Sequence, residues 1–206
     1  MRKSSPKVSI IIPYYRKKFF FKKTIESILK QSFKNFEIIV VYDDPDLSEL
    51  KVVKNILKKT KYKIIINKKN IGVGLSRNRG IQSVKGKYIA FCDADDLWHK
   101  DKLKTQINFM ENRKLNFSHT SYKIINYREK ILGKFNILHK LDYKSLLKSC
   151  DIATSSVIIK KNILGVKKHF SNSKTKEDYF LWLRIAKKEK YLYGIKNYLL
   201  MWRSTK

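Results

Sequence analysis

Three carboxylates stand within four positions of this chain, at Asp93, Asp95 and Asp96. They follow the short apolar run 88–92, which is long enough for one buried strand. Like charges this close repel one another and resist ionisation unless a positive group lies among them. Lys or Arg could supply that charge, but a divalent cation held by hard oxygen ligands fits better. The spacing therefore indicates a metal site that grips phosphate oxygens, as an enzyme acting on a nucleotide requires.

The same acidic run has a simpler interpretation, a solvated turn in which Asp96 caps the helix that follows. A second acidic pair, Asp43 and Asp44, bears on the choice because it also ends an apolar run, at residues 36–42. Parallel strands present their carboxyl ends at one edge of a sheet, where open α/β proteins bind ligands. Two strands that end in acids at the same edge therefore favour a binding site over a turn.

Alternation of short apolar runs with helical patterns predicts the elements that position these acids. Strands are expected at residues 8–12, 36–42, 62–66 and 88–92, the first ended by Pro13. Helices are expected between them, at residues 20–31, 47–57 and 75–84. Successive β-α-β units of this kind predict the α/β class, with a Rossmann-like, mostly parallel sheet flanked by helices.

The rest of the chain is less regular. A helix is expected after Asp96, with Leu103, Ile107 and Met110 on one face. Short β-like runs follow over residues 116–138, and further elements are expected as a strand at 155–159, a helix at 176–188 and apolar runs at 191–195 and 198–202. No linker or repeat divides the 206 residues, so a single domain is expected.

Composition limits the function classes. The formal net charge is +30, which fits either a solvated lysine-rich surface or attraction to a polyanion, nucleic acid or anionic membrane. The basic clusters form no stripe and match no nucleic-acid motif. No window approaches the roughly 20 apolar residues that span a bilayer. The two cysteines, Cys92 and Cys150, suggest a reducing compartment, and Cys92 is expected in the core. Neither the cysteines nor the four scattered histidines have the spacing of a zinc site.

Four ordered motifs resemble those of glycosyltransferase family 2, the inverting nucleotide-sugar transferases of GT-A fold. They cover nearly the whole chain and lie at residues 8–15, 39–44, 70–81 and 93–98. A fifth, Glu177-Asp178, resembles the motif that carries the catalytic base, although an acidic first turn of a helix is its other interpretation. Three positions depart from the family, since Arg16 replaces the usual Asn and Pro45-Asp46 replaces the usual Gly-Ser.

The resemblance implies a single GT-A domain, 1–206, with a nucleotide-sugar-binding half, 1–114, and a smaller mixed acceptor-binding half, 115–206. It implies a divalent metal, Mn²⁺ or Mg²⁺, on Asp95 and places the general base at Asp178. The residues that the resemblance assigns to the donor nucleotide are Pro13, Tyr15, Asp43, Asp44, Asn70, Gly72, Arg77 and Asp93, with Asp96 and Glu177 as secondary candidates.

Several of these roles have alternatives. Either Asp43 or Asp44 could contact the nucleoside, and Arg77 is either a bidentate phosphate donor or a surface arginine at a helix start. Trp98 and Trp182 either stack on sugar faces or, as their helical spacing favours, pack in the core.

The expected activity is inverting transfer of a sugar from a nucleoside diphosphate to an acceptor hydroxyl, in surface polysaccharide or lipopolysaccharide synthesis. The expected partners are a nucleotide-sugar and a glycan or lipid-linked acceptor, with peripheral contact to an anionic membrane at its cytoplasmic face and no nucleic acid. Two other hypotheses remain at this stage, a basic nucleic-acid-binding module and a catalytically silent nucleotide-sugar-binding relative.

Overall fold

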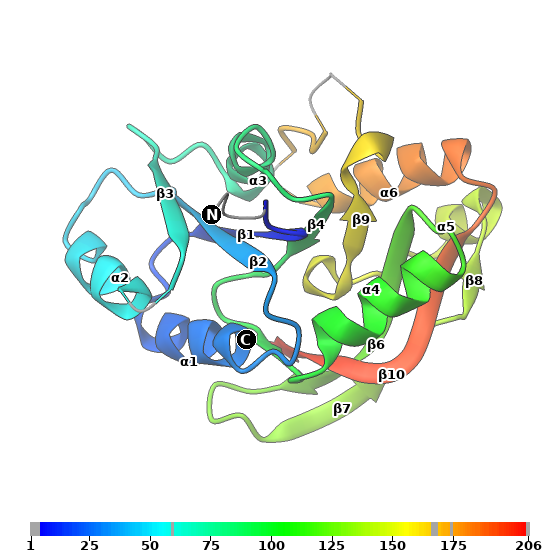
Figure 1. Cartoon of the computed structure of the whole chain (residues 1–206), viewed down its shortest axis with the longest axis horizontal. Helices are drawn as coiled ribbons and strands as arrows, with labels where there is room; N and C mark the ends of the chain where they lie inside the picture. Colours follow the sequence, from blue (N-terminus) through cyan, green and yellow to red (C-terminus); the bar gives the residue numbers. More distant parts are fainter. Residues whose placement is uncertain (1–4, 59, 166–168, 174, 205–206) are drawn as a thin grey trace.

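Strand β1 (Val8–Tyr14) lies in the parallel half of one mixed sheet (Figure 1). The structure is a computed structural model that describes residues 5–58, 60–165, 169–173 and 175–204. Strands β2 (Phe36–Tyr42) and β4 (Tyr88–Phe91) pair with β1 on either side, and β3 (Tyr62–Ile66) pairs with β2. All three pairings are parallel, as the β-α-β pattern predicts. The connecting helices are α1 (Lys18–Leu29), α2 (Leu50–Leu57) and α3 (Val73–Ile81).

The second half continues the sheet with mixed pairing, in the order β3-β2-β1-β4-β9-β6-β10-β5. Strand β9 (Ile158–Lys160) runs antiparallel to its neighbours β4 and β6 (Phe117–Ile125), whereas β10 (Leu192–Arg203) runs parallel to β6. The short strands β5 (Leu97–Trp98), β7 (Ile131–Phe135) and β8 (Lys140–Leu141) pair antiparallel with their neighbours. The helical segments here are α4 (Lys102–Asn112), α5 (Tyr143–Lys148), η1 (Thr154–Ser156), η2 (Lys161–Ile163) and α6 (Glu177–Lys188).

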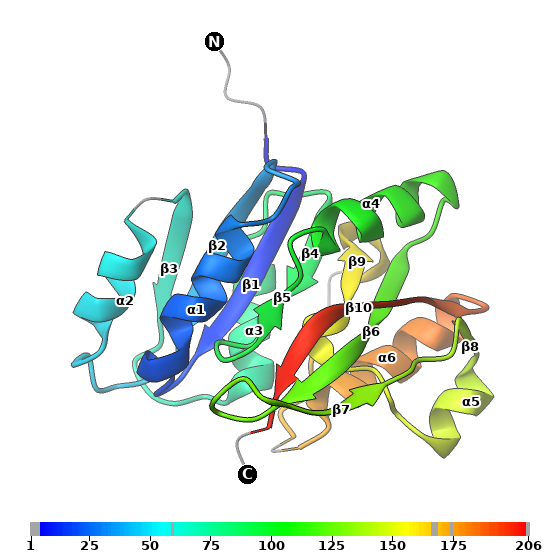
Figure 2. The same cartoon turned by 90° about the horizontal axis from the view of Figure 1, so that it is seen from below.

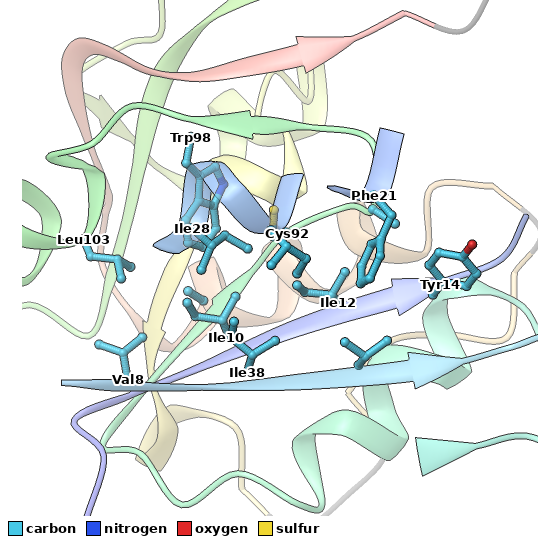
Figure 3. Close-up of a cluster of buried hydrophobic side chains, with 14 of the residues drawn as sticks. Val8, Ile10, Ile12, Tyr14, Phe21, Ile28, Ile38, Cys92, Trp98 and Leu103 are labelled. Atoms are coloured by element: carbon cyan, nitrogen blue, oxygen red, sulfur yellow. The ribbon is translucent and has the colours of Figure 1, made fainter. Parts of the chain in front are cut away.

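Alternate residues of the central strands enter two cores, one on each face of the sheet. On one face Val8, Ile10 and Ile12 pack with Cys92 against helices α1, α2 and α4 (Figure 3). On the other face Ile11 packs against residues of α3, α5 and α6. This burial fixes the register of β1, because a slip by one residue would exchange the two faces.

The carboxyl ends of β6 and β10 lie side by side, and β1 points to the same edge of the molecule (Figure 2). Strand β1 runs two residues past its predicted end, through Pro13 to Tyr14. The pairing of β1 with β4 stops at Ile11, so the proline removes no ladder hydrogen bond on that side. None of the helices in the described part of the chain has the length and apolar character that crossing a bilayer requires.

Candidate active site

Two acids of the segment after β4, Asp95 and Asp96, are buried, so the segment is not a solvated turn. Asp95 is 8% exposed and Asp96 is 1% exposed, and the short strand β5 follows them directly. The next helix, α4, begins at Lys102, so the expectation that Asp96 could cap it is wrong. Asp96 instead accepts a hydrogen bond from the backbone N–H of Arg203 at 2.8 Å.

Two cavities flank this acidic segment at the carboxyl edge of the sheet. The first, about 440 Å³, is lined by six of the predicted donor residues together with Asp95, which matches the size of a small-ligand site. These residues come from the ends of β1, β2 and β4 and from the loop before α3: Pro13, Tyr15, Asp43, Asn70, Gly72 and Asp93. The parallel strand order therefore gathers motifs that are far apart in the sequence.

Asp43 shapes the wall of this donor-side cavity by holding the loop before α3. One carboxylate oxygen accepts from the backbone N–H of Ile71 at 2.9 Å, and the other accepts from that of Gly72 at 2.9 Å. The amide of Asn70 donates to the Asp43 carbonyl at 3.0 Å. Gly72 adopts φ +87°, a left-handed conformation that favours glycine. The Asn-x-Gly motif therefore serves to close this loop against β2.

Asp44 is not among the residues that line the donor-side cavity. Its carboxylate accepts from Arg16 Nε at 3.0 Å and from the backbone N–H of Asp46 at 3.1 Å. Arg16 and Asp46 are two of the positions that depart from the family motifs, and here both contact the same carboxylate. The structure thus places Asp43 beside the cavity and Asp44 in a loop contact; the nucleoside role of either remains a prediction.

Arg77 lies inside the molecule and joins two carboxylates. It is 2% exposed, with Nη2 at 2.6 Å from Asp93 Oδ1 and Nη1 at 2.6 Å from Glu177 Oε1. Burial alone would lower the pKa of Arg77, but the carboxylates of Asp93 and Glu177 outweigh it and raise that pKa. Arg77 is therefore not a surface arginine, and its guanidinium is already paired with two carboxylates and is not free to bind a phosphate. Arg77 ties the donor side of the site to the start of α6.

The second cavity, also about 440 Å³, contains the predicted base. Asp178, in the first turn of α6, lines it and accepts a hydrogen bond from the hydroxyl of Thr154. Both cavities are lined by Val73, Asp93 and Trp202. The two spaces are therefore neighbours, with Asp95 on the wall of one and Asp178 on the wall of the other.

Whether these residues could bind a metal ion depends on the oxygen ligands that they present. Among the residues described, no three His, Cys, Asp or Glu side chains gather as a ready cage. Asp93 and Asp95 nevertheless present carboxylates to the same cavity, and the Lys17 ammonium lies 2.7 Å from Asp95 Oδ2, so the position already attracts a cation. Mg²⁺ and similar ions take one or two carboxylates and complete their shell with water and substrate phosphates. The residues therefore fit a metal shared between protein and donor.

Four residues that line the two cavities were not predicted from the sequence as site residues: Lys17, Thr154, Trp202 and Arg203. Arg203, 3% exposed, donates from Nε to the Asp95 carbonyl at 2.8 Å and so holds the acidic segment from β10. Burial raises the pKa of Asp96, next to it, well above its usual range. Of these four residues, only Lys17 could have been suspected from the sequence, because it lies just beyond the first motif. Trp98 and Trp182, by contrast, are buried core residues as expected, although Trp98 lies in strand β5 and only Trp182 lies in a helix.

Comparison with known proteins agrees with this geometry. The family model for Glycosyl transferase family 2 matches residues 9–165. Two Escherichia coli UDP-Glc:alpha-D-GlcNAc-diphosphoundecaprenol beta-1,3-glucosyltransferases are similar to the chain: WfaP at 40% identity over 184 residues and WfgD at 36% over 182. These alignments cover 88% and 87% of this chain and 70% of each relative. A Rickettsia felis glycosyltransferase is 38% identical over 88% of this chain.

Solved structures support the fold independently. Staphylococcus aureus TarS 1-349 superposes with a TM-score of 0.79 in complex with UDP and 0.80 with UDP-GlcNAc, at 21% and 19% identity. The fold is therefore the α/β GT-A type. The chain belongs to glycosyl transferase family 2. It spans 30% of the length of the Rickettsia felis relative and 60% of the TarS chain solved with UDP.

Proposed function

We propose that this chain transfers a sugar from a nucleoside diphosphate to an acceptor hydroxyl, with inversion at the anomeric carbon. The observation that carries the proposal is the pair of neighbouring cavities that share Asp93, one bearing Asp95 and the other Asp178. An attacking hydroxyl on the Asp178 side and a leaving diphosphate on the Asp95 side would stand on opposite faces of one sugar. A single displacement in that arrangement inverts the anomeric centre and needs no covalent intermediate.

The donor we propose is a uridine diphosphate sugar held in the first cavity. Support comes from WfgD and WfaP, named for UDP-Glc, and from TarS, solved with UDP and UDP-GlcNAc. Pro13, Tyr15 and the loop from Asn70 to Gly72 would receive the nucleoside, with Asp43 beneath that loop. Trp202, 38% exposed on the wall common to both cavities, offers an aromatic face to the sugar.

Asp95, with Asp93 beside it, would hold a divalent Mn²⁺ or Mg²⁺ ion. Such an ion would offset the charge that grows on the leaving diphosphate. Lys17 lies at the same carboxylate and can turn its ammonium to a phosphate oxygen once another cation takes its place.

Asp178 is the proposed general base. Its carboxylate lies at the amino end of α6, and Thr154 donates a hydroxyl hydrogen bond to Oδ2. That contact orients the carboxylate toward the cavity and leaves it able to accept the proton of an acceptor hydroxyl. A positioned base typically contributes about 10²–10⁴-fold to the rate.

The proposed acceptor is a lipid-linked glycan at the cytoplasmic face of a membrane, in surface polysaccharide synthesis. Support comes from the names of WfgD and WfaP, which specify a diphosphoundecaprenol acceptor. The net charge of +30 also suits an anionic leaflet, since attraction to such a surface adds with each nearby Lys or Arg.

A thermal-shift panel of UDP, GDP and CDP, each with and without manganese, tests the donor site. UDP with manganese is expected to raise the melting temperature, and Asp95→Asn should lose the manganese-dependent part of that rise. Stabilisation by duplex DNA or RNA in place of any nucleotide would instead support the nucleic-acid hypothesis.

Asp178→Asn tests the base. The variant should keep the full UDP-induced shift while transfer to a diphosphoundecaprenol-linked sugar falls about 10²–10⁴-fold, because only the proton acceptor is lost. Undiminished transfer would show that Asp178 is not the base. Wild-type protein that binds UDP-glucose and transfers nothing to such acceptors would be a silent relative.

A further inference from the structure

Two aromatic side chains stand almost free in solvent beside the mouth of the site. Phe19, in the first turn of α1, is 89% exposed, and Tyr127, in the turn between β6 and β7, is 62% exposed. Neither lines either cavity of the site. A single exposed apolar side chain needs no explanation, but two exposed aromatics on one surface beside the site suggest that a partner covers them.

The two aromatics belong to one surface because α1 and the β6–β7 turn are joined. Lys23 Nζ on α1 lies 2.6 Å from Glu129 Oε1 in the turn. The Arg203 guanidinium lies 4.6 Å from the ring centre of Phe20 and donates to the Tyr127 carbonyl at 3.2 Å. Both segments lie near the end of β10 in the two perpendicular views (Figures 1 and 2).

Exposed cationic residues accompany these aromatics on α1 and in the β6–β7 turn. The exposed cationic side chains are Lys18, Lys22, Lys23, Arg128 and Lys130. The two carboxylates nearby, Glu26 and Glu129, are each paired with a lysine of the same group, at 4.0 and 2.6 Å. The Arg128 guanidinium also lies over the Tyr127 ring, 5.2 Å from its centre, as in a cation–π contact. We call these cations, with Phe19 and Tyr127, the aromatic–lysine surface.

We propose that the aromatic–lysine surface docks on an anionic lipid bilayer. Aromatic rings settle at the headgroup level, and lysines around them are drawn to anionic headgroups, so the two features act together. Lys17, two residues before Phe19, lines the donor-side cavity, so docking here brings the mouth of that cavity to the lipid headgroups. That docking serves to reach a lipid-linked acceptor rests on the proposed function. The binding of the surface to an anionic bilayer does not depend on that function.

Vesicle binding tests the surface without any catalysis. Wild-type protein should bind phosphatidylglycerol-containing vesicles far better than pure phosphatidylcholine vesicles, and less as salt rises. The double variant Phe19→Ser/Tyr127→Ser should bind the anionic vesicles about tenfold more weakly. Lys18→Glu/Lys22→Glu should weaken binding by at least about fivefold for each charge removed.

Matched controls come from the opposite edge of the sheet and from α2. Tyr62→Ser, at the amino end of β3, and Lys51→Glu/Lys54→Glu, on α2, should bind anionic vesicles like wild type. An equal loss in the controls, unchanged binding of the double variant, or equal wild-type binding to both vesicle types would overturn the proposal. Each variant should keep its UDP-induced thermal shift; loss of that shift in wild type would instead count against the donor site.

Discussion

Arg77 shows what a single residue contributes to this site. Its guanidinium, 2% exposed, neutralises Asp93 on the donor side and Glu177 at the start of α6. Removing one partner from a buried ion pair leaves an uncompensated charge, which costs about 3–5 kcal/mol. Arg77 therefore stabilises the fold and, by the same contacts, connects the donor side of the site to the start of α6.

We expect Arg77→Met to lower the free energy of unfolding by about 3 kcal/mol in urea denaturation. The electrostatic cause predicts that Arg77→Met/Glu177→Gln recovers part of this loss, because one stranded carboxylate becomes a neutral amide. If the double variant is no more stable than Arg77→Met, lost packing rather than stranded charge explains the effect.

The positions of three carboxylates that line the donor-side cavity were predictable, but their partners were not. Strand-end position and spacing identify Asp43, Asp93 and Asp95. Nothing local in the sequence shows that Arg77 faces inward to bind Glu177, a hundred positions away. Lys17 and Arg203 likewise depend on which strands become neighbours, so their roles emerge only from the folded sheet.

At the scale of elements, the packing of α3 on β1 depends on the absence of a side chain. A Cβ added at Gly80 would lie 2.5 Å from Ile11 Cγ2, and Ile11 is fully buried in the core. Alanine favours helix over glycine by about 1 kcal/mol, but overpacking a core that cannot yield costs about 1–3 kcal/mol. The packing term is therefore the larger of the two.

Gly80→Ala should accordingly reduce the free energy of unfolding by about 1–2 kcal/mol, measured by urea denaturation. Gly133→Ala on β7 is the matched control, since a Cβ there meets its nearest atom, Ile124 Cδ1, at 3.9 Å. That variant should stay within about 0.5 kcal/mol of wild type. A stabilised Gly80→Ala would show that α3 shifts freely over β1.

The elements of the first half were predictable because each is a local pattern. Strands β1 to β4 and helices α1 to α3 alternate, and their apolar periods indicate both type and face. The later elements depend on distant pairing. The runs 191–195 and 198–202 form one strand, β10, which pairs in an irregular register with β6, more than seventy positions earlier in the chain. Sequence periodicity shows apolar runs there but cannot show that β10 is parallel to β6.

For the whole molecule, the strands that bring residues to both cavities belong to a single sheet that runs through both predicted halves. The predicted boundary at residue 114 falls between α4 and β6, and these halves remain a prediction. Strand β10 crosses the second half and returns Trp202 and Arg203 to the acidic segment after β4. Stability of this shared sheet therefore governs the geometry of the entire site.

His119, near the start of β6, makes that stability depend on pH. It is fully buried, and within the described part of the chain neither ring nitrogen has a hydrogen-bond partner. Burial, with a smaller contribution from His139, lowers the pKa of His119 to about 3. Between that value and the ordinary 6.5, the unfolded chain binds a proton that the folded chain does not. The stability is therefore complete above pH 6.5 and is lost as the pH falls toward 3.

We expect the free energy of unfolding to fall through His119 by about 1.4 kcal/mol for each pH unit below 6.5. His119→Leu removes the titrating ring, so its loss between pH 7 and pH 5 in urea denaturation should be about 2 kcal/mol smaller than that of wild type. His99→Leu, at an exposed histidine, should retain the wild-type loss. Equal losses in wild type and His119→Leu would mean that the buried imidazole accepts its proton without unfolding the sheet.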